Sequence, residues 1–189
     1  QIKAGQYKTA FTKETPATTL LNLGIDTTLF PNIDPFTNRT LTYHSHHRSH
    51  AAAGYYTSPY KDAAVLVIDS IGEFETLTAW HGKGDKLTKK FSQSYPHSIG
   101  LWYSAMTQRI GLKPNEDEYI LMGWAAIGDP NKYYYEILRD FFEPLEYGSL
   151  KVKFKWNLHR GCREWRPDLN TVQDYADIAA STQAVYEHV

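Results

Sequence analysis

The feature that most constrains the fold is a continuous apolar run over residues 63–68, Ala-Ala-Val-Leu-Val-Ile, which stops at Asp69. A short run of this kind, rich in β-branched residues, is typical of a strand buried on both faces of a sheet. The residues that follow, Asp-Ser-Ile-Gly over 69–72, predict a turn. Strand ends are where sheets present polar side chains to a crevice, so Asp69 is a candidate functional residue.

Two more strands and a helix follow this run. Residues 74–80 and 86–91 predict strands, and the segment 81–85, His-Gly-Lys-Gly-Asp, separates them as a turn, which gives a three-stranded antiparallel meander. Apolar residues recur at three and four over 99–110 and predict a helix. This β-β-β-α order predicts an α/β fold with a ribonuclease-H-like half, in which helices flank a mixed sheet.

The remaining segments are less distinctive. We expect helices over 16–24, 131–142 and from Thr171 onward, and a short helix within 43–56 that exits at Gly54. The apolar segment 118–126 is ambiguous. Residues 150–156 alternate and predict an edge strand whose lysines face water. The alternative for this segment is a basic and aromatic surface, continuing to Arg166, that could contact RNA.

Two histidines and the strand-end aspartate form the strongest candidate site. His46 and His50 are four residues apart, which on a helix places both imidazoles on one face, while His47 would point elsewhere. With Asp69 they would make a mixed nitrogen and oxygen ligand set that leaves positions open and suits Fe(II), Mn(II) or Zn(II). The alternative is a cluster of surface or capping histidines.

Two acidic segments are candidates for contact with a nucleotide or substrate. In residues 69–73, Ser70, Gly72 and Glu73 follow Asp69 as in the tight acidic turn of actin-like ATP-binding folds, or form an ordinary β-turn. In residues 113–119, three acids precede an apolar stretch, and the alternative there is a solvated loop.

Charge and cysteine content limit the partners and the compartment. Twenty Lys and Arg against twenty-one Asp and Glu give a net charge of −1, so no overall field draws the chain to nucleic acid or to a membrane surface. A single cysteine and the lack of any long apolar stretch predict a cytoplasmic protein. The chain begins with Gln1 and stops within a helical pattern, from which we expect a piece of a longer protein.

Five sequence blocks occur in one order from about residue 43 to the end. They are His-His-x-Ser-His-Ala, a strand ending in Asp with Gly-Glu following, Pro-His-Ser-x-Gly before a Tyr-Ser-Ala helix, Glu-Tyr-x-Leu-Met-Gly, and Asp-Ile-Ala-Ala-Ser-x-Gln. Together they resemble the NodU/CmcH family of O-carbamoyltransferases. Residues 43–189 carry these motifs, and residues 1–42 form a variable lead-in.

The resemblance implies the amino-terminal, actin-like domain of such an enzyme, related to the tRNA threonylcarbamoyl transferases. It implies ATP-dependent transfer of a carbamoyl group from a carbamoyl adenylate to a hydroxyl of a small-molecule acceptor, with carbamoyl phosphate as the upstream donor. The family's iron(II) ligands match His46, His50 and Asp69, and a further aspartate would come from later in the chain. The residues that would lie near nucleotide or substrate are Ser70, Gly72, Glu73, Glu118, Tyr119 and Gly123. Ser70 stands where the family usually has glycine, which disfavours a positive φ there.

By the same resemblance, the second half of the domain and a YrdC-like domain would follow Val189. We therefore expect this fragment to bind metal weakly and ATP poorly, to self-associate through an uncovered face, and to catalyse nothing alone. Two other hypotheses stay open: a tRNA-modifying relative, and an interaction domain that has kept the fold and lost the reaction.

Overall fold

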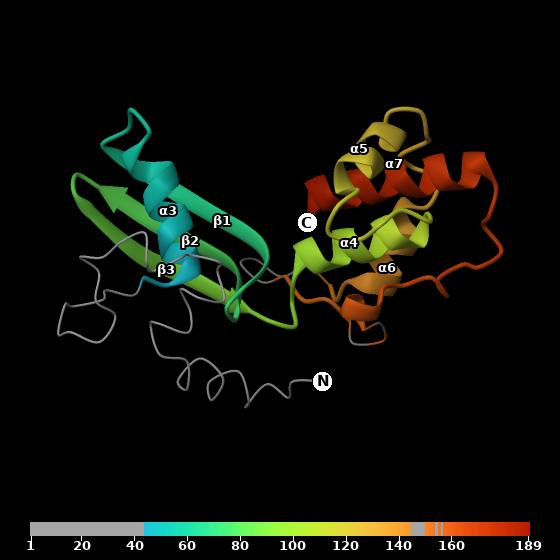
Figure 1. Ribbon diagram of the computed structural model, residues 1–189, viewed down its shortest axis with the longest axis horizontal. Coiled ribbons are helices and arrows are strands. Elements are labelled where there is room, and N and C mark those ends of the chain that lie inside the picture. The colour runs from blue at the N-terminus through green and yellow to red at the C-terminus, as the bar shows by residue number, and fades with distance from the viewer. Residues whose placement is uncertain (1–43, 145–149, 154, 156) are drawn as a thin grey trace, which may run out of the picture. The chain divides into compact units, whose positions relative to one another are not determined.

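The computed structural model describes residues 44–144, 150–153, 155 and 157–189 (Figure 1). Apart from His44, these residues belong to one compact unit, Ser45–Val189. The elements, in chain order, are α3 (His46–Tyr56), β1 (Asp62–Gly72), β2 (Glu75–Lys83), β3 (Lys86–Ser94), α4 (Ile99–Arg109), α5 (Glu118–Ala125), α6 (Tyr134–Phe141), the short 3-10 helix η2 (Leu158–Arg160) and α7 (Val172–His188). The expected helix over 16–24 lies outside the described residues.

The three strands form the expected meander, in the order β1-β2-β3 with both pairs antiparallel. No parallel strand occurs among the described residues, so the part of the sheet that the structure shows is antiparallel rather than mixed. The predicted turn at 69–72 is wrong: β1 continues through Gly72 after an irregularity that begins at Ile68, and the chain turns at Glu73, whose φ is +60°.

Strand β1 is also less buried than its apolar run predicts. It lies at an edge of the described sheet, where Val67 is buried but Leu66 and Ile68 are 62% and 44% exposed. The other edge is β3, whose lysines Lys86 and Lys89 are exposed, as is usual for an edge strand protected from pairing with other chains. That role was expected for 150–156, where the described residues form only an isolated bridge between Val152 and Phe142.

Helix α3 packs on the sheet (Figure 1) through residues spaced by one helical turn. His47, Ala51 and Tyr55 are its buried residues, and Ala51 joins a small core with Val67 and Trp80. The Tyr55 hydroxyl donates to a backbone carbonyl near the end of the sheet, that of Lys61 at 2.9 Å. The helix passes through Gly54, the expected exit, and ends at Tyr56, whose hydroxyl donates to the carbonyl of Asp85 between β2 and β3 at 2.9 Å.

The larger core lies among the four later helices. Helix α4, predicted by its periodicity, is buried along almost its whole length and places Trp102 and Met106 at the centre of this core. The ambiguous segment 118–126 is helix α5, and the expected helix over 131–142 is the shorter α6. Helix α7 begins as predicted, with a capping box between Thr171 and Asp174.

Polar side chains hold the irregular segments around this core. The buried Arg109 donates from its guanidinium to the backbone carbonyls of Trp165, Arg166 and Leu169. Cys162 is buried and lies 3.2 Å, Sγ to O, from the carbonyl of Ala105. No helix among the described residues has the length and apolarity needed to cross a membrane.

Candidate metal centre

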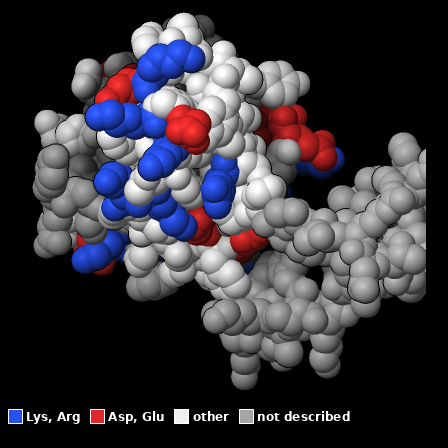
Figure 2. Space-filling view, turned by 90° about the vertical axis from the view of Figure 1, so that its left-hand side faces the viewer, with Lys and Arg blue, Asp and Glu red and all other residues white. Residues whose placement is uncertain are grey.

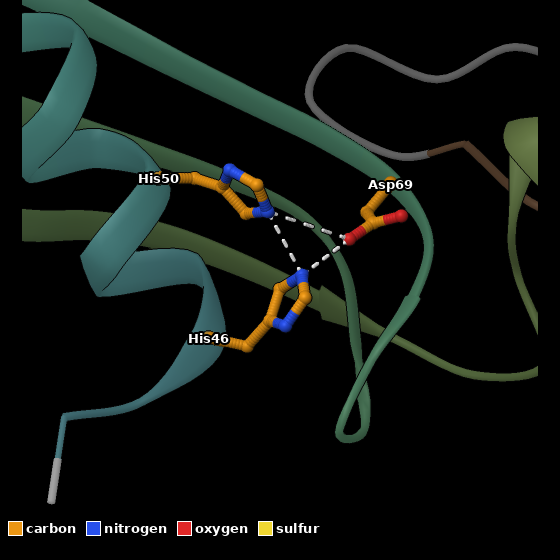
Figure 3. A group of neighbouring side chains, drawn as sticks. All are labelled: His46, His50 and Asp69. Atoms are coloured by element: carbon orange, nitrogen blue, oxygen red, sulfur yellow. Dashed lines mark hydrogen bonds and ion pairs between the residues drawn. The ribbon is translucent and has the colours of Figure 1, made fainter. Parts of the chain in front are cut away.

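Two elements bring the predicted ligands together, namely the first turn of α3 and the far part of β1 (Figure 3). His46 and His50 lie one turn apart on the side of α3 that faces Asp69. The approach is so close that a β-carbon at position 72 would lie 2.5 Å from the His46 and His47 rings. Glycine at position 72 therefore lets the start of the helix come near the end of the strand.

Three side-chain atoms converge on one small volume. The Nε2 atom of His46 lies 2.6 Å from Asp69 Oδ2 and 2.9 Å from His50 Nε2, and His50 Nε2 lies 3.9 Å from Asp69 Oδ2. Among the described residues, these three form a group of His and acidic side chains whose ligand atoms all lie within 4.8 Å of one another. All three side chains remain partly exposed, so ions and substrates can reach them.

The protonation chemistry of this cluster favours a cation at its centre. His46 Nε2 faces two partners, a carboxylate oxygen and a second imidazole nitrogen, but a ring nitrogen carries either one proton or one lone pair. A proton there serves the contact with Asp69 well and leaves no lone pair for His50; without it, a lone pair faces the carboxylate. A divalent ion would satisfy all three atoms at once, and two imidazoles with one carboxylate suit iron, manganese or zinc.

His47 turns away from this cluster, as its position on the helix predicts. Its side chain is fully buried, and its Nδ1 atom lies 2.9 Å from the hydroxyl oxygen of Thr78 on β2. Burial lowers the pKa of the His47 imidazole, because the charged form loses its hydration. This histidine therefore connects helix α3 to the sheet and does not belong to the candidate metal ligands.

The sheet contains a second histidine and aspartate contact that lacks a third ligand. His81 Nε2 lies 2.8 Å from Asp62 Oδ1, and Lys83 lies 3.7 Å from the other carboxylate oxygen. The hydrogen bond from His81 lowers the pKa of Asp62. Among the described residues, no second histidine approaches this pair. The pair therefore serves as a comparison for the cluster at His46.

The other predicted site residues are spread over two regions. Ser70 and Gly72 lie in β1, and the backbone N–H of Ser70 donates to Asp69 Oδ1 at 2.6 Å. Glu73 lies in the turn that follows and is exposed.

The second acidic segment opens helix α5. Glu118 is the first residue of the helix, while Tyr119 and Gly123 lie on exposed parts of it rather than in a loop. Ser70 and Glu118 both line a cavity of about 540 Å³ between β1 and the helices α4, α5 and α7. Gly72, Glu73, Tyr119 and Gly123 are not among its described lining residues.

Two residues that position the strand end were not singled out from the sequence. The Ser98 hydroxyl donates to the carbonyl of Ser70 at 2.7 Å and accepts from the N–H of Leu101, which caps α4. A β-carbon at Gly100 would lie 2.9 Å from the Ser70 backbone. The block Pro-His-Ser-x-Gly held this signal, because a serine just before a helix with glycine two residues later marks a cap and a close approach.

Comparison with known proteins identifies one family. The family model described as the carbamoyltransferase N-terminus matches residues 10–189. The protein sll1178 of Synechocystis sp. is 36% identical over 163 residues, covering 79% of this chain and 26% of its own. Nodulation protein NolO of Bradyrhizobium diazoefficiens is 29% identical over 148 residues (77% of this chain, 27% of NolO), and nodulation protein NolNO of Sinorhizobium fredii is 27% identical over 152 (79% and 22%). The chain thus spans about a quarter of the length of the curated relatives it matches.

Proposed function

We propose a function on one premise: this chain belongs to the carbamoyltransferase N-terminus family, whose model covers all but its first nine residues. The whole protein would transfer a carbamoyl group from a carbamoyl adenylate, made from ATP and carbamoyl phosphate, to a hydroxyl of a small-molecule acceptor. In that step the acceptor oxygen bonds to the carbamoyl carbon, the bond from that carbon to the phosphate oxygen breaks, AMP leaves, and the hydroxyl proton passes to a base.

The observation that carries this proposal is the convergence of His46, His50 and Asp69 at the end of β1. These residues would hold the divalent metal, which we take to be Fe(II). The bound ion would supply positive charge, which would offset the negative charge of the phosphate. The residues themselves bring two imidazole nitrogens and one carboxylate to one point, and they would leave coordination positions for a ligand from elsewhere.

The rest of the proposal concerns the whole protein. We propose that the sheet and helices described here form one half of an actin-like, ribonuclease-H-like ATPase domain in a cytoplasmic enzyme. The other half would close the nucleotide site, and the isolated chain would self-associate and lack activity. The antiparallel β1-β2-β3 meander followed by α4 supports this architecture.

The test uses the full-length protein with carbamoyl phosphate, ATP and Fe(II) under anaerobic conditions. We expect ATP to be converted to AMP only when carbamoyl phosphate is present. We also expect mass spectrometry to show one carbamoyl group gained by a hydroxyl compound from a panel of sugars and amino sugars. Conversion of ATP at the same rate with and without carbamoyl phosphate would refute the adenylate route.

A tRNA-modifying activity is the competing hypothesis, with the basic stretch 151–166 as its RNA contact. Arg166 is engaged within the protein, since it pairs with Glu136 at 2.7 Å and with Asp168 at 2.8 Å. Figure 2 shows the side of the sheet, where Lys and Arg gather with Asp and Glu among them. Binding of tRNA that weakens steeply with salt would favour the competitor instead.

A non-catalytic interaction domain is the remaining alternative. Isothermal titration of the full-length protein with ATP and metal separates it from the enzyme, because a domain that has lost its site should give no metal-dependent heat.

A further inference from the structure

Helix α5 is apolar on all its sides, but the described unit buries only one of them. From Tyr119 to Ile127 the sequence reads Tyr-Ile-Leu-Met-Gly-Trp-Ala-Ala-Ile, a run without any charged residue. On the inner side Leu121 is buried and Trp124 packs against the larger core, where α5 lies on α7 (Figure 1). A helix that is hydrophobic all round is usually buried on every side in the complete protein.

The outward side of α5 carries apolar residues at helical spacing. Met122, Gly123 and Ala126 follow Tyr119 by three, four and seven positions, so the four residues share one side, and Ile127 comes next in the turn after the helix. All five are exposed, and the large side chains among them, Tyr119, Met122 and Ile127, are 69%, 56% and 69% exposed. These five residues are here called the α5 stripe.

We propose that the α5 stripe is an interaction surface on which an apolar segment from another part of the same full-length polypeptide packs. The chain matches only 26% and 27% of the length of two curated relatives, so a whole protein of their size has ample further polypeptide to supply the segment. The segment should also bring one polar group to the Tyr119 hydroxyl, since a covered tyrosine usually keeps a hydrogen-bond partner. This inference goes beyond the proposed function and depends on neither the metal nor the transfer reaction.

The size of the α5 stripe favours a segment of the same polypeptide over a second copy of the protein. The stripe offers roughly 400 Å² of apolar surface, counting about 200 Å² for each large side chain when it is fully exposed. An interface of roughly 800 Å² over both sides lies within the range for contacts between domains of one chain. A stable dimer usually buries about 1,200–2,000 Å², so two copies that met through this stripe alone would separate. Covalent linkage removes that requirement, because it holds the segment at a high effective concentration.

The charges beside the α5 stripe favour a protein segment over a membrane surface. Three acidic residues, Glu116, Asp117 and Glu118, directly precede Tyr119, and the stripe itself contains no Lys or Arg. The nearby Lys113 is already paired with Glu116 at 2.6 Å. Helices that lie on membranes are rich in Lys and Arg, which attract anionic lipids, whereas the acidic start of α5 would be repelled by them.

Hydroxyl-radical footprinting of the full-length protein, without ligand or lipid, tests whether the α5 stripe is covered. Tyr119 is the decisive probe, because it is largely exposed in this unit and is not among the residues that line the cavity beside Asp69, whereas Met122 is. We expect Tyr119 to be modified about tenfold more slowly than in a short peptide of the same sequence, because radicals would reach it only when the covering segment opens. A Tyr119 rate equal to that of the peptide would overturn the proposal.

A photoreactive phenylalanine analogue placed at position 127 of the full-length protein identifies what covers the α5 stripe. We expect mass spectrometry to find a cross-link to an apolar peptide that lies outside residues 1–189 of the same polypeptide. Mixing protein labelled with nitrogen-15 and unlabelled protein reveals contacts between copies, because these join a labelled peptide to an unlabelled one. Such a mixed cross-link, or Tyr119 protection that is lost on dilution, would show that a second copy covers the stripe and would overturn the proposal.

A charge placed within the α5 stripe should release the covering segment. Ile127→Glu leaves the larger core of this unit unaltered, because Ile127 is exposed there, but it would put a carboxylate against the apolar segment, so the Tyr119 rate should rise about tenfold. Tyr135→Glu on α6 is the matched control, since Tyr135 is 79% exposed and lies outside the stripe, and it should leave the Tyr119 rate unchanged. Full protection of Tyr119 in Ile127→Glu would contradict the proposal. If Ile127→Glu does not fold, the footprint of the unmodified protein still decides.

The docking surface and the proposed function can fail separately. If the full-length protein transfers a carbamoyl group while Tyr119 is modified as fast as in the peptide, the reaction stands and the docking surface is wrong. If Tyr119 is protected and cross-linking joins position 127 to another part of the same polypeptide, the docking surface stands whether or not any transfer is observed.

Discussion

The imidazole of His47 and the hydroxyl of Thr78 meet at 2.9 Å, and this buried contact joins helix α3 to strand β2. The same hydroxyl oxygen accepts a hydrogen bond from the indole N–H of Trp80 at 2.8 Å. The neighbouring His46 takes no part in this contact, because its imidazole lies 2.6 Å from Asp69 instead.

Replacing His47 by alanine should therefore weaken the fold and spare the ligands. We expect the free energy of unfolding to fall by about 2–4 kcal/mol, because the change opens a cavity and removes a buried hydrogen-bond partner of Thr78. Urea denaturation measures this loss. Where the variant is still folded, its metal content should equal that of the unmodified protein, and loss of metal from folded protein would show that the wrong histidines have been chosen.

The His46→Ala and Asp69→Ala variants should show the opposite behaviour. Each removes one of three converging ligand atoms from a partly exposed site, so bound iron should be lost while the unfolding midpoint changes little. Elemental analysis of the purified protein measures this. His81→Ala is the control, because it breaks a histidine and aspartate contact of similar length without a third ligand. Iron retained in stoichiometric amount by either variant would contradict the assignment.

Arg109 should be essential to the packing of the segment near Trp165. Its guanidinium donates hydrogen bonds to three backbone carbonyls, and methionine has no N–H group to replace these bonds. Arg109→Met should therefore lower the free energy of unfolding by about 3–5 kcal/mol. Arg109→Lys should recover only part of this loss, because one ammonium group cannot match the planar fork. Thermal and urea unfolding of both variants test this, and a full recovery by lysine would show that charge alone suffices.

Gly128 and Gly123 form a matched pair for alanine substitution. A β-carbon at position 128 would lie 2.0 Å from the backbone oxygen of Ala176 in α7, so Gly128→Ala must push the two segments apart and should cost about 1–3 kcal/mol. Gly123 lies in α5 with no atom within 4 Å of such a carbon, and alanine there should add about 0.5–1 kcal/mol of stability. Equal effects at the two positions would contradict the packing of the 128 loop on α7.

The thiol of Cys162 should be silent in the folded protein. Burial raises its pKa to about 12 from a usual value near 9, so little thiolate forms at neutral pH. We expect iodoacetamide to label Cys162 only after urea is added. Because the unfolded state ionises first, this thiol should also make stability fall as the pH rises from 9 toward 12. Rapid labelling without urea at pH 7 would show that this part of the core opens readily.

Local patterns in the sequence predicted the elements that carry the candidate centre. The four-residue spacing of His46 and His50 needs only a helix, and the strand that carries Asp69 needs only its apolar run. Both elements form, and the three side chains meet, although the strand runs past Asp69 to Gly72. The periodicity of α4 and the capping of α7 are local signals of the same kind. Whether the cluster holds iron remains a prediction.

Signals that depend on distant partners were misleading or absent. The apolar run of β1 predicted burial on both faces, yet burial depends on which elements cover a strand, and Leu66 is largely exposed in the described unit. The alternation over 150–156 resembled an edge strand, but only Val152 finds a backbone partner, at Phe142. The cavity beside Asp69 could not be predicted, because its contact between Tyr103 and Gln183 joins two sequence blocks that are 80 positions apart, and no local pattern shows that the blocks meet.

The meander topology of the sheet has a consequence for the order in which the molecule assembles. His46 and Asp69 are only 23 positions apart, and all three strands are joined by tight hairpins, whereas the larger core needs α7, which comes after every other element described. Contacts between neighbours in sequence close with the smallest entropic cost and form fastest. On a ribosome, the three candidate ligands would thus be able to converge once Ser94 has emerged, while α7 is still being synthesised. We therefore expect this cluster to form in the nascent chain before the helical core around Trp102 is complete.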